Sequence, residues 1–485
     1  MLLQVPVEVT SRIFSLCDPA SITQTCRAFA AIAYSTQSLW STTQLSPSQL
    51  VPGAADHLRR RLQRAGALTL KVSIGPMSAG ASANLFIINE LCSVLSSFNL
   101  QINRMEVTAE TALLAGHILS IIYSQTSTPF PALCTLFVQV TDDAEYPSPC
   151  TWPRLDKFLE CTTFPMLKTL RISSHFDCIP VPPPGNSLSF DHLHTLILDG
   201  TMEQESPSIA LIVNLLHSTP QLENLWLKTL TSEQPVTVMD ATIPRSIKNA
   251  QAILIPVLLP NLTRLSITAP GAGTDLLHCI EAPVLHDVHL DGSRPPAYLD
   301  LTGEDFSWSQ IDTTQVQSSL KRLATRSPEL RRLAITSTYL SHEGWRWLLL
   351  GDGEGPPFPQ LETLALHELE PLSGNIHCGF DDALLMEYAR QPSVSLRRLC
   401  LRHCTFALGG SAVVRLFENV INGAPGKECE LEIDRLCQGI TEAHLDVLAK
   451  CGVKIVFHHK LDEELNRGES WSRGCDIDGP DSYAY

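Results

Sequence analysis

The sequence predicts an α/β fold in which short parallel strands alternate with helices, preceded by a small all-helical module at the N-terminus. Three observations favour this fold. The phrase Leu-x-x-Leu-x-Leu, with Ile or Val at some of its positions, occurs nine times between residues 133 and 401. The segments between its copies carry apolar residues at helical spacing. Residues 3–40 carry a separate pattern that is helical throughout.

Each copy of the recurring phrase predicts a short buried strand. The last two apolar residues stand two apart, so both point to the same side of a strand. A proline lies two residues before the first leucine in seven of the nine copies, and successive copies begin 23 to 45 residues apart. The copies begin at Leu133, Leu167, Leu193, Leu222, Leu262, Leu285, Leu330, Leu361 and Leu396. Weaker copies at Ile102, Leu431 and Val453 extend the array.

The intervening segments predict the helices. Ser206 and Pro207 are typical of a helix start and precede an apolar stripe over residues 209–216. Residues 316–323 carry a similar stripe. Further helices are expected over residues 381–388, 413–420 and 442–449. Each helix is expected to cover the buried side of the strand before it.

This array resembles the leucine-rich-repeat family, in the longer intracellular form with a helix in each repeat, over roughly residues 66–460. The resemblance implies a right-handed α/β solenoid, or horseshoe, with the strands on its concave side. The array departs from the family pattern in its irregular repeat lengths and in lacking a consistent Asn after the third leucine. Residues 43–65 are expected to be a linker with one short basic helix over residues 58–64. Residues 461–485 hold seven acidic and two basic side chains and are expected to be a disordered tail.

The N-terminal pattern predicts three short helices that bury too little surface to be stable alone, so a partner is expected to complete their core. Residues 1–42 resemble an F-box. The matching residues are Pro6, Glu8, Ile13, Phe14, Leu16, Asp18, Pro19, Cys26, Arg27, Leu39 and Trp40. Val5 stands where the family has Leu, and Phe29 where it has Trp. The stretch from Pro19 to Cys26 is a residue or two short.

The two resemblances together imply a substrate-recognition subunit of a Skp–cullin–F-box ubiquitin ligase. Such a subunit binds the Skp adaptor, and through it a cullin, while its repeats hold a target protein. It has no catalytic residues, cofactor or metal. The adaptor contacts implied are Val5, Pro6, Glu8, Ile13, Phe14, Leu16, Pro19, Ile22, Cys26, Phe29, Leu39 and Trp40. Two alternatives stay open: residues 3–40 form a helical cap on the solenoid, and the repeats form a protein-binding scaffold that works without a cullin.

The outward side chains of the predicted strands indicate where a target would bind. At the third, fifth and seventh positions of the nine copies stand six positive and three negative residues, a net charge of +3 in a chain of −16. This contrast favours an acidic or phosphorylated target near Arg332, Arg398 and Arg402, because a guanidinium binds such groups in two places. Alternatively, these arginines only give the exposed surface of the sheet a hydrated, charged layer and have no role in recognition. The expected contacts are Phe137, Arg171, Ile197, Trp226, Lys228, Arg264, His289, Arg332, His367, Arg398 and Arg402.

Composition excludes several other classes of protein. With 51 acidic against 35 basic residues, the chain is not expected to bind nucleic acid or an anionic membrane. Its 15 scattered cysteines indicate a reducing compartment, the cytoplasm, the nucleus or both. No secretory signal and no apolar run of about 20 residues is visible. The sequence also lacks a Gly-x-Ser-x-Gly elbow, a P-loop and a Rossmann fingerprint, so an enzyme is not expected.

Overall fold

The computed structural model describes about two thirds of the chain, in two compact units. Unit 1 is Met1–Pro283 with Pro295–Leu299, and unit 2 is Val284–Arg294 with Asp300–Tyr485. The described residues are 9, 13–14, 17, 19–77, 82–124, 131–141, 155, 158–159, 164–173, 190–199, 209–228, 256–268, 273–292, 313–338, 340–353, 355–367, 380–391, 395–402, 404, 408–423, 426, 428–434 and 439–458. The predicted acidic tail, 461–485, lies outside them.

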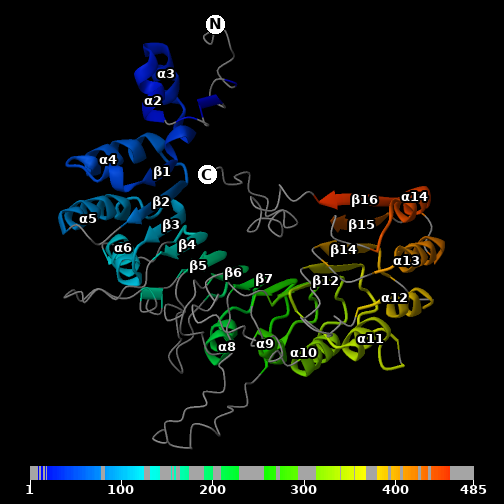
Figure 1. Cartoon of the computed structure of the whole chain (residues 1–485). Coiled ribbons are helices and arrows are strands. Elements are labelled where there is room, and N and C mark those ends of the chain that lie inside the picture. Colours follow the sequence, from blue (N-terminus) through cyan, green and yellow to red (C-terminus); the bar gives the residue numbers. More distant parts are fainter. Residues whose placement is uncertain are drawn as a thin grey trace, which may run out of the picture. The chain divides into compact units, whose positions relative to one another are not determined.

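Unit 1 is built on an open parallel sheet whose strand order follows the chain (Figure 1). Its strands are β1 (Thr42–Leu45), β2 (Leu70–Met77), β3 (Ile102–Ala109), β4 (Thr135–Val140), β5 (Thr169–Ser173), β6 (Thr195–Asp199), β7 (Asn224–Lys228) and β9 (Arg264–Thr268). Each of these strands pairs in parallel with the next one. The strands β8 (Val257–Leu258) and β10 (Ile280–Glu281) form a separate small parallel sheet.

The helices of unit 1 include a pair before the sheet and others between its strands. They are α2 (Pro19–Thr25), α3 (Arg27–Ser35), η2 (Gln37–Trp40), η3 (Pro47–Gln49), α4 (Ala54–Ala65), α5 (Ser82–Ser96), α6 (Ala112–Ser124), α8 (Ile209–His217) and α9 (Gly273–Cys279). α6 shows why these segments are helical. Leu114, Ile118 and Ile122 recur every four residues and are fully buried, which fixes one side of the helix in the core.

Unit 2 repeats the same architecture. Its strands are β11 (Asp287–Asp291), β12 (Arg332–Thr336), β13 (Thr363–His367), β14 (Arg398–Arg402), β15 (Cys429–Asp434) and β16 (Val453–His458). They pair in parallel, in chain order. The helices α10 (Thr313–Arg326), α11 (His342–Leu350), α12 (Asp382–Ala389), α13 (Gly410–Gly423) and α14 (Glu442–Lys450) alternate with the strands. In Figure 1, α12, α13 and α14 lie along one side of the strands they connect.

Within each unit, the strand register confirms the alignment of the predicted copies, five in unit 1 and four in unit 2. Thr135, Thr169 and Thr195 are partners across β4, β5 and β6, and the leucines that follow them are aligned as well. The leucines at this position in the five copies of unit 1 form a continuous core row and are at most 1% exposed: Leu136, Leu170, Leu196, Leu225 and Leu265. Each buried leucine contributes on the order of 2 kcal/mol to the free energy of unfolding. The repeated phrase therefore builds the hydrophobic core strand by strand.

Strands occur beyond the strongest copies, upstream in unit 1 and downstream in unit 2. The weak copies are complete strands, β3, β15 and β16. Across the expected boundary between the F-box (1–42) and the linker (43–65), Thr42–Leu45 forms β1 and pairs with β2, and α4 runs over Ala54–Ala65. Thr43 and Leu45 are buried while their neighbours are exposed, so this short strand alternates as a sheet edge requires. The sheet thus begins upstream of residue 66. None of the described helices has the length and apolarity needed to cross a membrane.

Candidate functional site

Each sheet has one face of leucines, which is buried, and one face of polar and mixed side chains. β4 illustrates the alternation, with Phe137 half-exposed between Leu136 and Val138, which are buried. We call the polar side of each sheet its outward face. In unit 1 it includes Arg104, Glu106, Phe137, Arg171, Ile197, Asp199, Trp226, Lys228 and Arg264. In unit 2 it includes Asp287, His289, Asp291, Arg332, His367, Arg398, Cys400, Arg402, Glu430, Glu432, Asp434 and Lys454.

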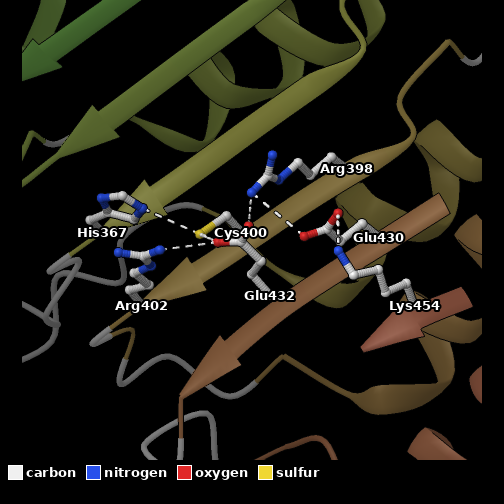
Figure 2. Close-up of polar contacts among 7 residues, drawn as sticks. All are labelled: His367, Arg398, Cys400, Arg402, Glu430, Glu432 and Lys454. Atoms are coloured by element: carbon white, nitrogen blue, oxygen red, sulfur yellow. Dashed lines mark hydrogen bonds and ion pairs between the residues drawn. The ribbon is translucent and has the colours of Figure 1, made fainter. Parts of the chain in front are cut away.

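The outward face of unit 2 carries a network of ion pairs centred on Glu432, whose side chain is 5% exposed (Figure 2). Arg398 Nη2 donates to Glu432 Oε1, and Arg402 Nη2 donates to Glu432 Oε2 at 3.2 Å. Glu430 extends the network, because its Oε1 lies 3.5 Å from Arg398 Nη2 and its Oε2 accepts from Lys454 Nζ at 3.3 Å. Two predicted target contacts, Arg398 and Arg402, are therefore ion-paired within the chain.

The same network includes a cysteine and a histidine. Cys400 Sγ donates to Glu432 Oε2 at 3.1 Å, and His367 Nε2 lies 3.3 Å from that sulfur (Figure 2). Burial raises the pKa of Cys400 to about 11, although the charges of Arg402 and Arg398 lower it. The group is thus a neutral thiol near pH 7 and donates a hydrogen bond. A nucleophilic cysteine needs the thiolate form, so the geometry favours a structural role for Cys400.

His289 and Arg332 are also engaged within unit 2. His289 Nε2 lies 3.1 Å from Thr336 Oγ1 on the neighbouring strand. Burial lowers the pKa of His289 to about 4, and the charge of Asp291 offsets only part of this effect. The imidazole is therefore neutral near pH 7. Arg332 Nε lies 3.7 Å from Asp287 Oδ1, so its charge faces a carboxylate as well.

The lowered pKa of His289 predicts that unit 2 loses stability as the pH falls. The folded protein takes up this proton only near pH 4, whereas an unfolded chain takes it up near 6.5. Between these values the unfolded state binds more protons, so acidification favours unfolding by up to about 1.4 kcal/mol per pH unit. We expect the stability lost between pH 7 and pH 5, measured by urea unfolding, to be smaller for His289→Gln than for the wild type. Equal losses in the two proteins would contradict the assignment.

The charge balance of unit 2 differs from the one predicted. On its outward face four cations (Arg332, Arg398, Arg402, Lys454) stand against five anions (Asp287, Asp291, Glu430, Glu432, Asp434), a net charge of −1 with neutral histidines. Three of those anions come from β15, which is only a weak copy of the phrase and is not part of the predicted row. The signal is visible in Glu430-Leu431-Glu432-Ile433-Asp434, where acidic and apolar residues alternate as in a strand.

The outward face of unit 1 retains a positive balance. Five cations (Lys71, Arg104, Arg171, Lys228, Arg264) stand against two anions (Glu106, Asp199), a net charge of +3. Arg104 pairs with Glu106 at 2.6 Å, and its guanidinium lies 5.0 Å from the centre of the Phe137 ring. Arg104 and Glu106 come from β3, another weak copy, and the predicted row omits them. The structure thus places the surplus positive charge in unit 1.

On β5, β6 and β7 the structure brings five outward side chains together. Asp199 Oδ2 lies 3.5 Å from both Arg171 Nη2 and Lys228 Nζ, so one carboxylate is shared by two cations. Ile197 and Trp226 are half-exposed, and the register aligns both with Arg171 in one row across the three strands, next to the row of Asp199 and Lys228. We call Arg171, Ile197, Asp199, Trp226 and Lys228 the β5–β7 patch.

The predicted adaptor contacts divide into buried and exposed residues. Phe14, Pro19, Ile22, Leu39 and Trp40 are buried within the chain, so any role in docking is indirect. Phe29 is half-buried and packs edge-on against Phe14, with ring centres 5.1 Å apart. Cys26 is exposed, and its Sγ accepts a hydrogen bond from Phe29 N at the start of α3. Ile13 is exposed, as is Val9 four residues before it in the sequence. Val5, Pro6, Glu8 and Leu16 lie outside the described residues.

Trp40 connects the N-terminal helices to the sheet. Its indole Nε1 donates to Ala33 O at 2.8 Å, and its ring stacks on Tyr34 with centres 5.9 Å apart. The guanidinium of Arg64, on α4, lies 4.5 Å from the Tyr34 ring and 4.7 Å from the Trp40 ring. This arrangement orients α3 against the helix that precedes β2.

Comparison with known proteins identifies no family for this chain: no protein-family model matches it, and no curated protein is significantly similar to it. Among the described residues, no group of three or more His, Cys, Asp and Glu side chains is arranged to hold a metal ion. The geometry on which a function can be argued is therefore that of the N-terminal helices and of the two outward faces.

Proposed function

We propose that this chain is a substrate-recognition subunit of a Skp–cullin–F-box ubiquitin ligase. In this proposal the N-terminal helices form an F-box that binds the Skp adaptor, and the strand–helix array is a leucine-rich-repeat domain that binds a target protein. The observation that carries the proposal is an apolar surface before the repeats. Val9 and Ile13 are 47% and 41% exposed and stand four residues apart, as on one side of a helix.

The structure of the N-terminal helices supports a docking role in physical terms. Few apolar side chains are buried among the described residues of this region, namely Phe14, Ile22, Ala33, Leu39 and Trp40, while the aliphatic Val9 and Ile13 are exposed. Burying both against a partner would contribute on the order of 3 kcal/mol. Such a subunit needs no catalytic group, because holding the target beside the ubiquitin-conjugating enzyme raises its effective concentration there.

One observation favours a second candidate, a protein-binding scaffold whose N-terminal helices cap the repeats without a cullin. Arg64 contacts Tyr34 and Trp40, and the chain passes from η2 directly into β1, which pairs with β2. A cap is expected to make such contacts with the first strands. The two candidates differ in whether the exposed Val9 and Ile13 bind a partner.

Replacing Ile13 by Asp is expected to lower recovery of the Skp adaptor at least about tenfold, because a carboxylate would be buried in the interface. The measurement is co-purification of the full chain with a co-expressed Skp adaptor. Ile13 is exposed, so the change is expected to leave the chain folded. Val51→Asp is the matched control, since Val51 is 52% exposed and lies outside the predicted motif. Equal recovery of both variants, or no adaptor on the wild type, would favour the scaffold.

A further inference from the structure

The two outward faces differ in whether their charges are already satisfied by the chain. In unit 2, Glu432 is held by Arg398 and Arg402, and Glu430 is held by Arg398 and Lys454. In unit 1, the single carboxylate of Asp199 is shared by Arg171 and Lys228. The side chain of Asp199 is 21% exposed, whereas those of Arg171 and Lys228 are 38% and 47% exposed. The two cations therefore reach solvent more than the anion between them.

The apolar part of the β5–β7 patch lies beside these cations, in the row that begins with Arg171. Trp226 and Lys228 stand two apart on β7 and thus share one face of the strand, and Ile197 and Asp199 do the same on β6. Since neighbouring strands lie about 4.8 Å apart, the row from Arg171 through Ile197 to Trp226 spans about 10 Å. This is the length of about three residues of an extended peptide.

We propose that the β5–β7 patch is the target-binding site and that it takes a peptide segment in which a carboxylate or phosphate stands beside an apolar side chain. The anionic group would accept hydrogen bonds from Arg171 and Lys228, which share the single carboxylate of Asp199 among the described residues. The apolar side chain would pack on Ile197 and the Trp226 ring, since half-exposed aromatic residues are frequent anchors at interfaces. The inference rests on the proposed function only in calling the bound segment a target.

Charge also decides between this partner and a nucleic acid. A nucleic acid backbone needs a run of cations, one for each phosphate contacted, and the patch offers two cations that share one anion. Beyond the patch the chain as a whole carries a net charge of −16, which repels a long polyanion. A single anionic group beside an apolar contact fits both the charge and the size of the patch.

The test uses the full chain and degenerate peptide libraries with a fixed central Asp, phosphoserine or Lys. The wild type is expected to retain the Asp or phosphoserine library over the Lys library at least about fivefold, and to prefer apolar residues beside the fixed position. Comparison of the Asp and phosphoserine arms tells which anion is recognised. Arg171→Gln/Lys228→Gln is expected to abolish the preference for an anion, and Trp226→Ala the preference for the apolar neighbour. Raised salt is expected to weaken only the preference of the wild type for an anion.

The control removes the same charge elsewhere. Arg415 and Lys450 are exposed on helices of unit 2, and Arg415→Gln/Lys450→Gln is expected to bind the libraries like the wild type. Equal retention of all libraries by the wild type, or equal losses in the patch and control variants, would overturn the proposal. Because no adaptor is present in this assay, a failure here is distinct from a failure of the Ile13→Asp experiment.

Discussion

Replacing Glu432 by Gln is expected to lower the free energy of unfolding of unit 2 by about 3 kcal/mol, because the loss leaves two guanidinium groups facing an uncharged amide. Glu432 is 5% exposed and accepts from Arg398, Arg402 and the thiol of Cys400. Gln has the same shape as Glu, so the packing is kept. Its NH2 group, however, is a donor, and it would face the donor groups from which a carboxylate oxygen accepts in the wild type. The effect is therefore electrostatic and not steric.

The measurement is hydrogen exchange over β14 and β15, combined with urea unfolding. Glu430→Gln is the matched control, since Glu430 stands two residues earlier on the same strand and its side chain is 22% exposed. Removing the charge of Glu430 is expected to lower the free energy of unfolding by less than about 1 kcal/mol, as for ion pairs that water screens. If the two variants were equally stable, Glu432 would not be the centre of the network.

This prediction affects how the arginines of β14 are tested. Reversing Arg398 and Arg402 to Glu would place two more carboxylates beside Glu432, which already accepts hydrogen bonds from both arginines. Such a variant is expected to disturb the pairing of β14 with β15. Loss of partner binding would then report damage to the strands and not removal of a recognition site. The half-exposed cations of the β5–β7 patch can be changed without this complication.

Gly75→Ala is expected to destabilise unit 1 by more than about 3 kcal/mol or to prevent folding. Gly75 lies inside β2 with φ +128°, a region that residues with a Cβ rarely adopt. An added Cβ would stand 2.9 Å from the Thr108 carbonyl carbon and 2.8 Å from Thr108 Cβ, and closer still to the Thr108 carbonyl oxygen. Because Thr108 belongs to β3, relief would require the two strands to separate. Thermal unfolding of the full chain measures the loss.

Gly53→Ala separates the backbone effect from the clash. Gly53 precedes α4 with φ +85°, and a Cβ there would have no heavy atom within 4 Å. This change is expected to cost about 1–2 kcal/mol, the penalty for a left-handed conformation alone. A Gly75→Ala protein no less stable than Gly53→Ala would show that β2 and β3 can move apart at little cost.

Much of the fold is predictable from the sequence because the core is periodic. Leu136, Leu170 and Leu196 hold equivalent positions in the phrase and prove to be register partners, because parallel strands in chain order bury equivalent residues side by side. The ends of the array are less predictable. β15 matches the phrase only weakly and β1 does not match it, yet both are strands because a neighbouring strand offers them backbone partners.

The candidate site is predictable in position but not in charge. Alternation along a strand places Arg398 and Arg171 on the outward face alike, and the sequence has no signal that distinguishes them. The difference comes from the next strand: Arg398 meets Glu430 and Glu432 on β15, whereas Arg171 meets Asp199, which also faces Lys228. Such pairings join residues 28 to 34 positions apart, across loops of irregular length.

The α/β class, the parallel order of the strands and the identity of the outward side chains follow from the amino-acid pattern alone, because they depend on short-range periodicity. The folded structure is needed to show which outward charges are satisfied and which of the predicted N-terminal contacts are buried. Phe14 and Trp40 match the same motif as Ile13, yet the chain covers the first two and leaves Ile13 exposed. Burial and pairing depend on neighbours distant in the chain, and a local pattern carries no information about them.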